Sequence, residues 1–277
     1  MNPKYKVIVQ QALIILAATT LLFLCFVPII LMVNTSLKSN AQVYGDFWSF
    51  AHPIQWVNYH AAFSLLVRNM INSMIVVSVA VGMTVLLSAT SGYVFSRIEF
   101  PGKAVLYMMV ISLMMIPGIL TLTPLYKLVL AMHLKNTWIG LIAPWISGGQ
   151  VFGIILCRTF MKEMPDSIFE AARIDGCSEL KALFKIAMPL SKPILATLMI
   201  MNMMGFYNDY IWPLMIIDSN KLQVITVAIK VFQAANGTVD IGSMLAGYVI
   251  ATVPLLILFI FGSRLYIEGI TSGAVKA

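Results

Sequence analysis

The chain has 277 residues, of which 60% are apolar and only 10% are charged, whereas about 25% of the residues of an ordinary soluble domain are charged. Together with a mean hydropathy of +0.91, this composition excludes an intrinsically disordered chain, a nucleic-acid-binding module and most soluble enzymes. We therefore interpret the formal net charge of +7 as basic loop residues of a membrane protein rather than as a surface for a polyanion.

Six apolar stretches are long enough to cross a membrane as helices, because a spanning helix needs about 20 such residues. In chain order they cover residues 12–33, 69–96, 104–126, 136–157, 194–217 and 241–263. Continuous apolar runs without strict alternation favour helices over a membrane barrel. The sequence therefore predicts an all-α membrane protein, with residues 1–277 forming one domain of six transmembrane helices.

Two of these stretches leave a local question open. The first follows Lys4 and Lys6 as the core of a signal peptide would, but it is longer than such a core and no small-x-small site follows it, so we expect a retained helix. In the third stretch, Pro117 and Pro124 predict either a break in the helix or an ordinary kink.

The distribution of Lys and Arg residues predicts the orientation of the six helices. With six spans both termini lie on one side, and that side also carries the loops around 97–103 and 158–193. It holds twice as many basic residues as the opposite side. Because loops rich in Lys and Arg remain in the cytoplasm, we expect both termini and the 158–193 loop to be cytoplasmic.

The 158–193 loop has a helical sequence pattern of its own. Ser167 and Glu170 have the spacing of a capping box, in which a serine hydroxyl binds free N–H groups and a glutamate reaches back, so a helix is predicted from this point. Gly176 then interrupts it. A second helix is predicted from about Ser178, with its apolar residues on one face. The expected structure is a helix–turn–helix outside the membrane.

This helix–turn–helix has two alternative roles, lying on the lipid surface or docking to a soluble protein. A helix on the lipid surface would be mostly basic, whereas this loop has nearly equal numbers of acidic and basic residues, which favours docking. Ala171 and Ala172 are small enough for close approach to a partner, and Gly176 permits the turn. Glu170 and Asp175 are candidates for ion pairs with basic groups of the partner, the alternative for Glu170 being a helix cap alone.

The same loop resembles the signature of a transporter family. It contains Glu170-Ala171-Ala172, three residues, Gly176, nine residues, and then Ile186-Ala187-Met188-Pro189. This order and spacing resemble the signature of the inner-membrane permease subunits of bacterial ABC importers. The one departure is Met188, which stands in place of a leucine and conserves its volume.

Shorter motifs extend the resemblance over nearly the whole chain and narrow it to the carbohydrate-uptake permeases of the maltose-permease-like type. These motifs are Asn72-Ser73, Tyr93–Arg97 with Phe100-Pro101-Gly102, Leu134–Thr137, Asn208–Tyr210 with Trp212–Leu214, and the tail Gly269–Lys276.

The resemblance implies a bacterial inner-membrane protein with the type I ABC importer transmembrane fold, whose cytoplasmic loop inserts a coupling helix into an ATPase. The implied partners are a homologous second permease subunit, two cytoplasmic ATP-binding subunits, an outer-face solute-binding protein, a sugar or oligosaccharide to be imported, and the surrounding lipid. ATP and Mg²⁺ would bind to the ATPase. This chain has no Gly-x-x-x-x-Gly-Lys-[Ser/Thr] motif, so we expect it to hydrolyse no ATP and to hold no cofactor.

The fifth stretch carries the one ionisable residue found inside a predicted span. An acidic group at the centre of a membrane helix costs about 2.5–3.5 kcal/mol, which Asp209 offsets if it faces a polar cavity. The amide and aromatic groups beside it suit the hydroxyls and the apolar face of a sugar ring. The alternative is a lock between helices or anchoring at the membrane interface. The candidates for the substrate path are Asn208, Asp209, Tyr210, Trp212, Gln150 and Asn72.

Two other functions agree less well with the sequence. An ion-coupled secondary transporter of a small polar solute would need several buried charged or unwound positions, and often an inverted repeat, whereas the spans contain a single carboxylate. A membrane enzyme would need a catalytic cluster, which the spans do not supply. The three cysteines and three histidines are scattered along the chain, so we predict neither a disulfide framework nor a metal site.

Overall fold

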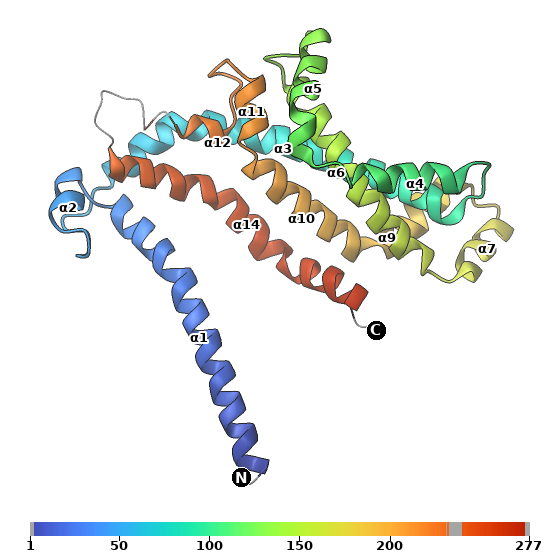
Figure 1. The fold of residues 1–277 in the computed structure, drawn as a ribbon, viewed down its shortest axis with the longest axis horizontal. Helices are drawn as coiled ribbons and strands as arrows, with labels where there is room; N and C mark the ends of the chain where they lie inside the picture. Colours follow the sequence, from blue (N-terminus) through green and yellow to red (C-terminus); the bar gives the residue numbers. More distant parts are fainter. Residues whose placement is uncertain (1–2, 231, 233–239, 275–277) are drawn as a thin grey trace. The chain divides into compact units, whose positions relative to one another are not determined.

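The computed structural model describes residues 3–230, 232 and 240–274 (Figure 1). This described part is mainly helical and contains no β-strand, which confirms the all-α prediction. The chain divides into two units, one formed by residues 1–67 with 229–252 and the other by residues 68–228 with 253–277. Two long helices, α3 (Val57–Arg97) and α14 (Ile241–Ala274), begin in the first unit and continue in the second.

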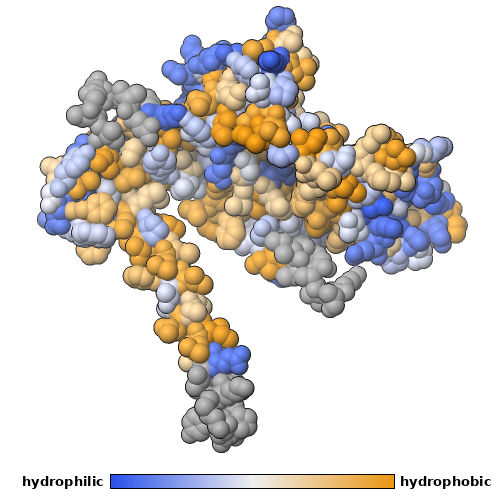
Figure 2. Space-filling view, viewed as in Figure 1, coloured by the Kyte–Doolittle hydropathy of each residue, from blue (hydrophilic) through white to orange (hydrophobic). Residues whose placement is uncertain are grey.

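The first unit contains the long helix α1 (Pro3–Ser36), which covers the first predicted span and extends beyond both of its ends. From Gln10 to Ser36 it is apolar enough to cross a membrane, and its most apolar stretch is not buried within the chain. Figure 2 shows hydrophobic side chains along most of its length. Such a helix is suited to an apolar environment supplied by lipid or by another subunit.

A buried lysine organises the connection that follows α1. Lys38 is fully buried, and its Nζ donates to the carbonyl oxygens of Asp46 and Phe47 at 2.9 and 2.8 Å. The short helix α2 (Asn40–Gly45) lies within this connection and begins with a capping box in which Ser39 and Gln42 exchange hydrogen bonds. The charge-free pattern of the sequence predicted neither α2 nor the burial of a lysine.

The second unit holds the remaining helices. They are the rest of α3, α4 (Lys103–Leu113), α5 (Gly118–Ala131), α6 (Trp138–Lys162), α7 (Asp166–Ile174), α8 (Glu179–Ala182), the π-helical turn η1 (Leu183–Ala187), α9 (Met188–Leu190), α10 (Lys192–Asn208), α11 (Ile211–Ile216), α12 (Ile225–Ala228) and the rest of α14.

Four helices of the described chain are long and apolar enough to span a membrane, and six spans result if each of two bent pairs is counted as one. The predicted third span, 104–126, is divided into α4 and α5, whose axes meet at 100°. The helix is interrupted at residues 114–117, the last of which, Pro117, is the N-cap of α5. This is the break rather than the kink. The second bent pair joins Glu179–Leu190 to Lys192–Asn208 at 80°. The predicted fifth span, 194–217, is also divided at Asp209, where α10 ends and α11 follows.

The core of the second unit is a close contact of α3 with α6 and α10. A Cβ added at Gly153 of α6 would collide with Ser88 of α3 and stand 3.0 Å from Leu198 of α10. Small residues permit this approach, as is common between membrane helices. Ser88 and Leu198 are fully buried, so α3, α6 and α10 pack closely and position the loops at their ends.

Candidate functional site

The loop between α6 and α10 forms the predicted helix–turn–helix, but its first helix begins differently from the prediction. Helix α7 starts at Asp166, its N-cap is Pro165, and no side chain caps its free N–H groups. The capping box predicted for Ser167 and Glu170 is therefore wrong, because the helix begins two residues too early for Ser167 to be its N-cap. Glu170 is exposed and is left free of a capping role.

The turn at Gly176 is confirmed. Its φ of 75° lies in the left-handed region, where glycine carries no steric penalty. The N–H of Gly176 donates to the carbonyl of Arg173 at 3.0 Å, and the N–H of Cys177 donates to that of Ala172 at 2.9 Å. These bonds satisfy the last carbonyls of α7 in the manner of a glycine C-cap. Ser178 then precedes α8, at the predicted start of the second helix.

A buried arginine attaches α7 to the end of α3. The side chain of Arg97 is 7% exposed, and its guanidinium forms an ion pair with Asp166, at the first turn of α7. Its Nη2 also donates to the carbonyl oxygens of Met161 and Met164 at the end of α6. The guanidinium carbon lies 4.4 Å from the centroid of the Phe169 ring, within range of a cation–π contact. One side chain thus joins α3, α6 and α7.

One turn earlier on α3, Tyr93 attaches the second helix of the loop. Its hydroxyl donates to Oε2 of Glu179 at 2.7 Å, and Nε of Arg173 donates to Oε1 at 3.1 Å. These two donors stabilise the carboxylate, and the hydrogen bond from Tyr93 is the larger cause that holds the pKa of Glu179 below its ordinary value. Glu179 therefore connects α3, α7 and α8.

The two faces of α7 differ in their surroundings. Phe169 and Ala172 are buried against the chain, which places Ala172 inside the loop rather than on its outer surface. The opposite face, by helical spacing, carries four exposed residues, Ser167, Glu170, Ala171 and Ile174. We call these four residues the outer face of α7. Asp175 and Gly176 are also exposed, and Ile174 is 87% exposed although the loop is charged.

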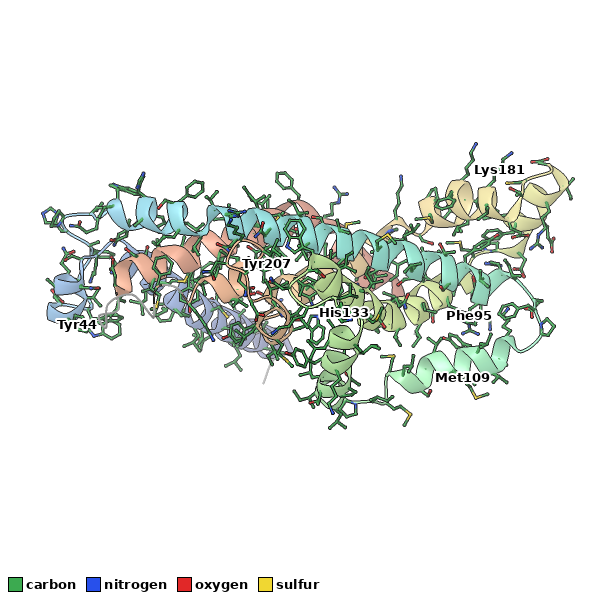
Figure 3. The ribbon with its side chains drawn as sticks, turned by 90° about the horizontal axis from the view of Figure 1, so that it is seen from above. Tyr44, Phe95, Met109, His133, Lys181 and Tyr207 are labelled. Atoms are coloured by element: carbon green, nitrogen blue, oxygen red, sulfur yellow. The ribbon has the colours of Figure 1, made fainter. Side chains whose placement is uncertain are left out.

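The figures show this loop as a polar end of the second unit. Figure 2 shows hydrophilic side chains gathered over the end that carries α7. In Figure 3, Lys181 of α8 points away from the ribbon. Ile174 is therefore an exposed apolar residue within a mainly polar surface.

The break in the fifth span surrounds Asp209 with hydrogen-bond donors. Its Oδ2 accepts from the indole Nε1 of Trp145 at 2.7 Å, and its Oδ1 accepts from the backbone N–H of Trp212 at 3.3 Å. Its carbonyl oxygen accepts from the hydroxyl of Thr226 at 2.8 Å. The Trp145 ring is stacked on Phe206, with centroids 5.3 Å apart and planes 5° apart. Asp209 is thus fixed between α6, α10 and α11.

The other predicted path residues have different environments. Asn208 is exposed, and its amide donates to the carbonyl of Met204 at 2.9 Å. Tyr210 and Gln150 are half-buried. Trp212 is buried, with its indole Nε1 donating to the carbonyl of Gly140 at 3.3 Å. The structure therefore joins Asp209 and Trp212 directly, with Asn208 and Tyr210 as their chain neighbours.

Asn72 lies in a separate network. Its amide donates to the carbonyl oxygens of Lys221 and Gln223, both at 3.0 Å, and the Ser73 hydroxyl accepts from the N–H of Ile225 at 2.8 Å. The Asn72-Ser73 motif thus fixes the segment before α12 through its backbone. Among the described residues, no hydrogen bond joins Asn72 to Asp209.

A second motif from the sequence also acts on backbone groups. Asn136 has a φ of 60°, and its Oδ1 accepts from the N–H groups of Asp218 and Ser219 at 3.2 and 2.9 Å. Lys135 forms an ion pair with Asp218 at 2.9 Å. The motif Leu134–Thr137 therefore ties the turn before α6 to the segment after α11. The tail motif Gly269–Lys276 ends among residues 275–277, which lie outside the described residues.

Sequence reasoning missed three residues at these sites, namely Tyr93, Arg97 and Trp145. Tyr93 and Arg97 were noted only as part of a motif, and their spacing of four residues on one helix was the available signal that they share a face. Trp145 is an indole donor within an apolar span, a group that usually finds a partner when buried. In the chain that the structure describes, no group of three His, Cys, Asp or Glu side chains is placed to hold a metal ion.

Comparison with known proteins identifies the family of this chain. Residues 85–267 match the family described as "Binding-protein-dependent transport system inner membrane component", which is more than half of the chain. The chain belongs to this family. The resemblance predicted from the Glu170–Pro189 signature is thereby confirmed, and the chain is an inner-membrane, multi-pass permease subunit of an ABC transporter.

Individual relatives agree with this assignment. The permease is 32% identical to a probable ABC transporter permease protein, YurM of Bacillus subtilis, over 90% of this chain and 83% of the relative. It is 30% identical to the melibiose/raffinose/stachyose import permease protein MelC of the same organism, over 91% of each chain. Its fold resembles a chain of the crystal structure of a bacterial ABC transporter involved in the import of the acidic polysaccharide alginate, with a TM-score of 0.83 at 19% identity, covering 95% of this chain and 98% of that one. These matches confirm the predicted importer transmembrane fold.

Proposed function

We propose that this permease moves a sugar or oligosaccharide from an outer-face solute-binding protein into the cytoplasm, driven by ATP hydrolysis on separate subunits. The family supplies the binding-protein-dependent route, and a relative covering 91% of the chain is named as an oligosaccharide import permease, which supports the substrate class. An ion-coupled mechanism is not proposed, because this family depends on a binding protein.

The observation that carries the proposal is the attachment of the 158–193 loop to α3. Arg97 and Tyr93 tie α7 and α8 to one turn of a helix that runs through the core. A loop held this firmly transmits displacement, whereas a loose loop would absorb it. We infer that the outer face of α7, with Glu170 and Ala171 at its centre and Asp175 and Gly176 beside it, docks into a cytoplasmic ATPase. In this proposal the loop and both termini are cytoplasmic.

The remaining partners are proposed from the apolar helix surfaces that this chain does not itself cover. The most apolar stretch of α1 is exposed, and α4 also presents exposed apolar side chains, as expected of a subunit that packs against a second, homologous permease and lipid. Two ATP-binding subunits, one beneath each permease, would hold ATP and Mg²⁺. This chain itself is proposed to hold no cofactor, and no nucleic acid is among its partners.

For the substrate path we propose the polar break between α10 and α11. The stacked pair Trp145–Phe206 offers an aromatic surface, and Asp209 beside it offers a carboxylate that is already oriented by two donors. Asn208 and Tyr210 extend this group, and the half-buried Gln150 lies five residues beyond Trp145 on α6. Asn72 and Trp212 would act by holding the backbone around the path, because their donors are bound to carbonyl oxygens.

The docking proposal is tested by one substitution on the outer face of α7. Ala171→Arg places a long charged side chain on an exposed helix position, so the permease should still fold and reach the membrane in wild-type amounts. The ATPase should no longer co-purify with it, and sugar uptake should fall at least tenfold. Ala131→Arg, the same change at the exposed last residue of α5, is the matched control and should leave both properties unchanged. Wild-type co-purification with Ala171→Arg would refute the docking surface.

A further inference from the structure

A second feature lies at the same end of the second unit, outside the 158–193 loop, which we call the coupling loop after its proposed role. A cavity of about 810 Å³ opens between the end of α3, the start of α4 and the end of α6. Its lining includes Phe95, Phe100, Lys103, Tyr107, Arg158 and Lys162. Figure 3 shows α4 turning back beside the end of α3 that carries Phe95, with Met109 further along α4. None of these residues belongs to the outer face of α7.

The cationic groups of this cavity are only partly neutralised. The guanidinium carbon of Arg158 lies 3.9 Å from the centroid of the Tyr107 ring, and the Nε of Arg158 donates to the carbonyl of Phe95 at 3.3 Å. These two contacts hold the planar guanidinium group in one orientation. Among the described residues, no carboxylate forms an ion pair with Arg158 or Lys162. Lys103 is paired with Glu99 at 2.8 Å. The lining of the cavity therefore contains three cationic side chains, Lys103, Arg158 and Lys162, and one carboxylate, Glu99.

The surroundings of the cavity are apolar and exposed. Val105 and Met108, which line it, are 54% and 66% exposed, and Met109 on the same helix is 58% exposed. Because α3 ends at Arg97 and α6 ends at Lys162, the cavity lies where spanning helices end. A ligand that satisfies both parts needs an anionic head for the cations and an apolar body for the face of α4.

We propose that this cavity binds the phosphate of an anionic phospholipid, with the acyl chains along α4. An arginine held over an aromatic ring presents a planar fork that matches phosphate oxygens, and basic pockets between membrane helices bind anionic headgroups. Lys162 adds a second charge at the rim. The proposal depends on the proposed function only in assigning the site to the cytoplasmic leaflet. Since Phe95 is two residues from Arg97, a bound lipid would brace the turn of α3 that holds the coupling loop.

Lipid binding by the purified permease, together with whatever subunits accompany it, tests the proposal. After delipidation, phosphatidylglycerol or phosphatidylcholine is titrated in and bound lipid is counted by native mass spectrometry. Wild type should bind phosphatidylglycerol at least tenfold more tightly. Arg158→Gln with Lys162→Gln should weaken that binding at least tenfold, since each cation near an anionic lipid is worth about fivefold. Lys127→Gln with Lys221→Gln removes two exposed lysines elsewhere and should change it less than twofold.

Two further arms separate the alternatives. Lys162→Gln alone removes a side chain with no hydrogen bond among the described residues, so it should fold normally and weaken binding about fivefold. Glycerol phosphate and inorganic phosphate, added as soluble competitors at the concentration of the lipid, should not displace it. If either competitor displaces phosphatidylglycerol as well as added phosphatidylglycerol does, the lipid assignment is overturned. If wild type and the double variant bind phosphatidylglycerol with equal affinity, the site is overturned. The docking test with Ala171→Arg reports separately on the proposed function.

Discussion

The attachment of the coupling loop to α3 depends most on Arg97, so its removal is the sharpest test of the structure. Arg97→Ala would remove the guanidinium donor from the carbonyl oxygens of Met161 and Met164, of which Met161 keeps backbone donors, and would leave the Phe169 ring without its cation. The ion pair with Asp166 would also be lost, but that carboxylate is 81% exposed and contributes at most about 1 kcal/mol.

The magnitude follows from the groups that are buried. Hydrogen bonds from a charged donor contribute about 1.5–3 kcal/mol each, and a cation–π contact adds about 0.5–2 kcal/mol. Allowing for relaxation and replacement by water, we expect α7 to lose about 3 kcal/mol of local stability, which is roughly a 150-fold increase in its detached population. Arg97→Lys should fall between wild type and Arg97→Ala, because an ammonium reproduces neither the fork nor the stacking.

Hydrogen exchange of the amides of residues 161–175 measures this population directly, and sugar-stimulated ATPase activity of the assembled importer measures its consequence. Exchange should accelerate about 100-fold or more in Arg97→Ala, and stimulation should fall while basal ATPase activity persists. Asp166→Asn is the control, since it removes only the exposed partner and should change exchange by less than about fivefold. If Asp166→Asn has the same effect as Arg97→Ala, or if neither alters exchange, the attachment does not depend on the buried contacts.

Three further outcomes are expected. The lowered pKa of Glu179 means that its attachment to Tyr93 stabilises the loop fully above the ordinary carboxyl pKa of about 4.3 and that this stability is lost as the pH falls through the lowered value, so the protection of the loop amides, relative to their intrinsic exchange rates, should fall only in acid below the ordinary pKa, and Glu179→Gln should abolish this dependence. Trp145→Phe keeps the stack on Phe206 but removes the donor to Asp209, and we expect uptake to fall about tenfold with unchanged abundance, measured with labelled sugar; equal uptake would contradict a role for this bond. Lys38→Met removes a buried ammonium and with it two charge-assisted hydrogen bonds to the carbonyl oxygens of Asp46 and Phe47, about 1.5–3 kcal/mol each, although Asp46 keeps the Ser49 hydroxyl as a donor; limited proteolysis should therefore cut the connection after α1 faster than in wild type, while Lys127→Met should have no such effect.

The parts of the fold that the sequence predicted are those with local signals. Long apolar runs without charge predicted the spanning helices, and a glycine between two amphipathic segments predicted the turn at Gly176, because both depend on residues adjacent in the chain. The capping box predicted at Ser167 is absent because another local signal sets the start of α7. Pro165 is suited to the position before a helix, and α7 therefore begins at Asp166.

The contacts that build the sites could not be predicted in this way. Arg97 and Asp166 are 69 residues apart, and Asn72 is 149 residues from Lys221, so no periodicity relates them. Asp209 illustrates the limit most clearly. Its cost inside a membrane span predicted a polar environment, but only the structure shows that the helix ends there and that an indole from α6 supplies the partner.

The position of these contacts along α3 links the two sites within the second unit. Near one end of this segment, Asn72 and Ser73 hold the backbone of residues 221–225, and Thr226, the next residue, binds the carbonyl of Asp209. Some 20 to 25 residues later, or about 30–37 Å along a helix, Tyr93 and Arg97 hold the 158–193 loop. Each attachment is made by a side chain of α3 that is itself buried. In the proposed docking, a displacement of the 158–193 loop would act on one continuous helix, α3, and the same helix carries the Asn72-Ser73 anchor of the segment that holds the polar break.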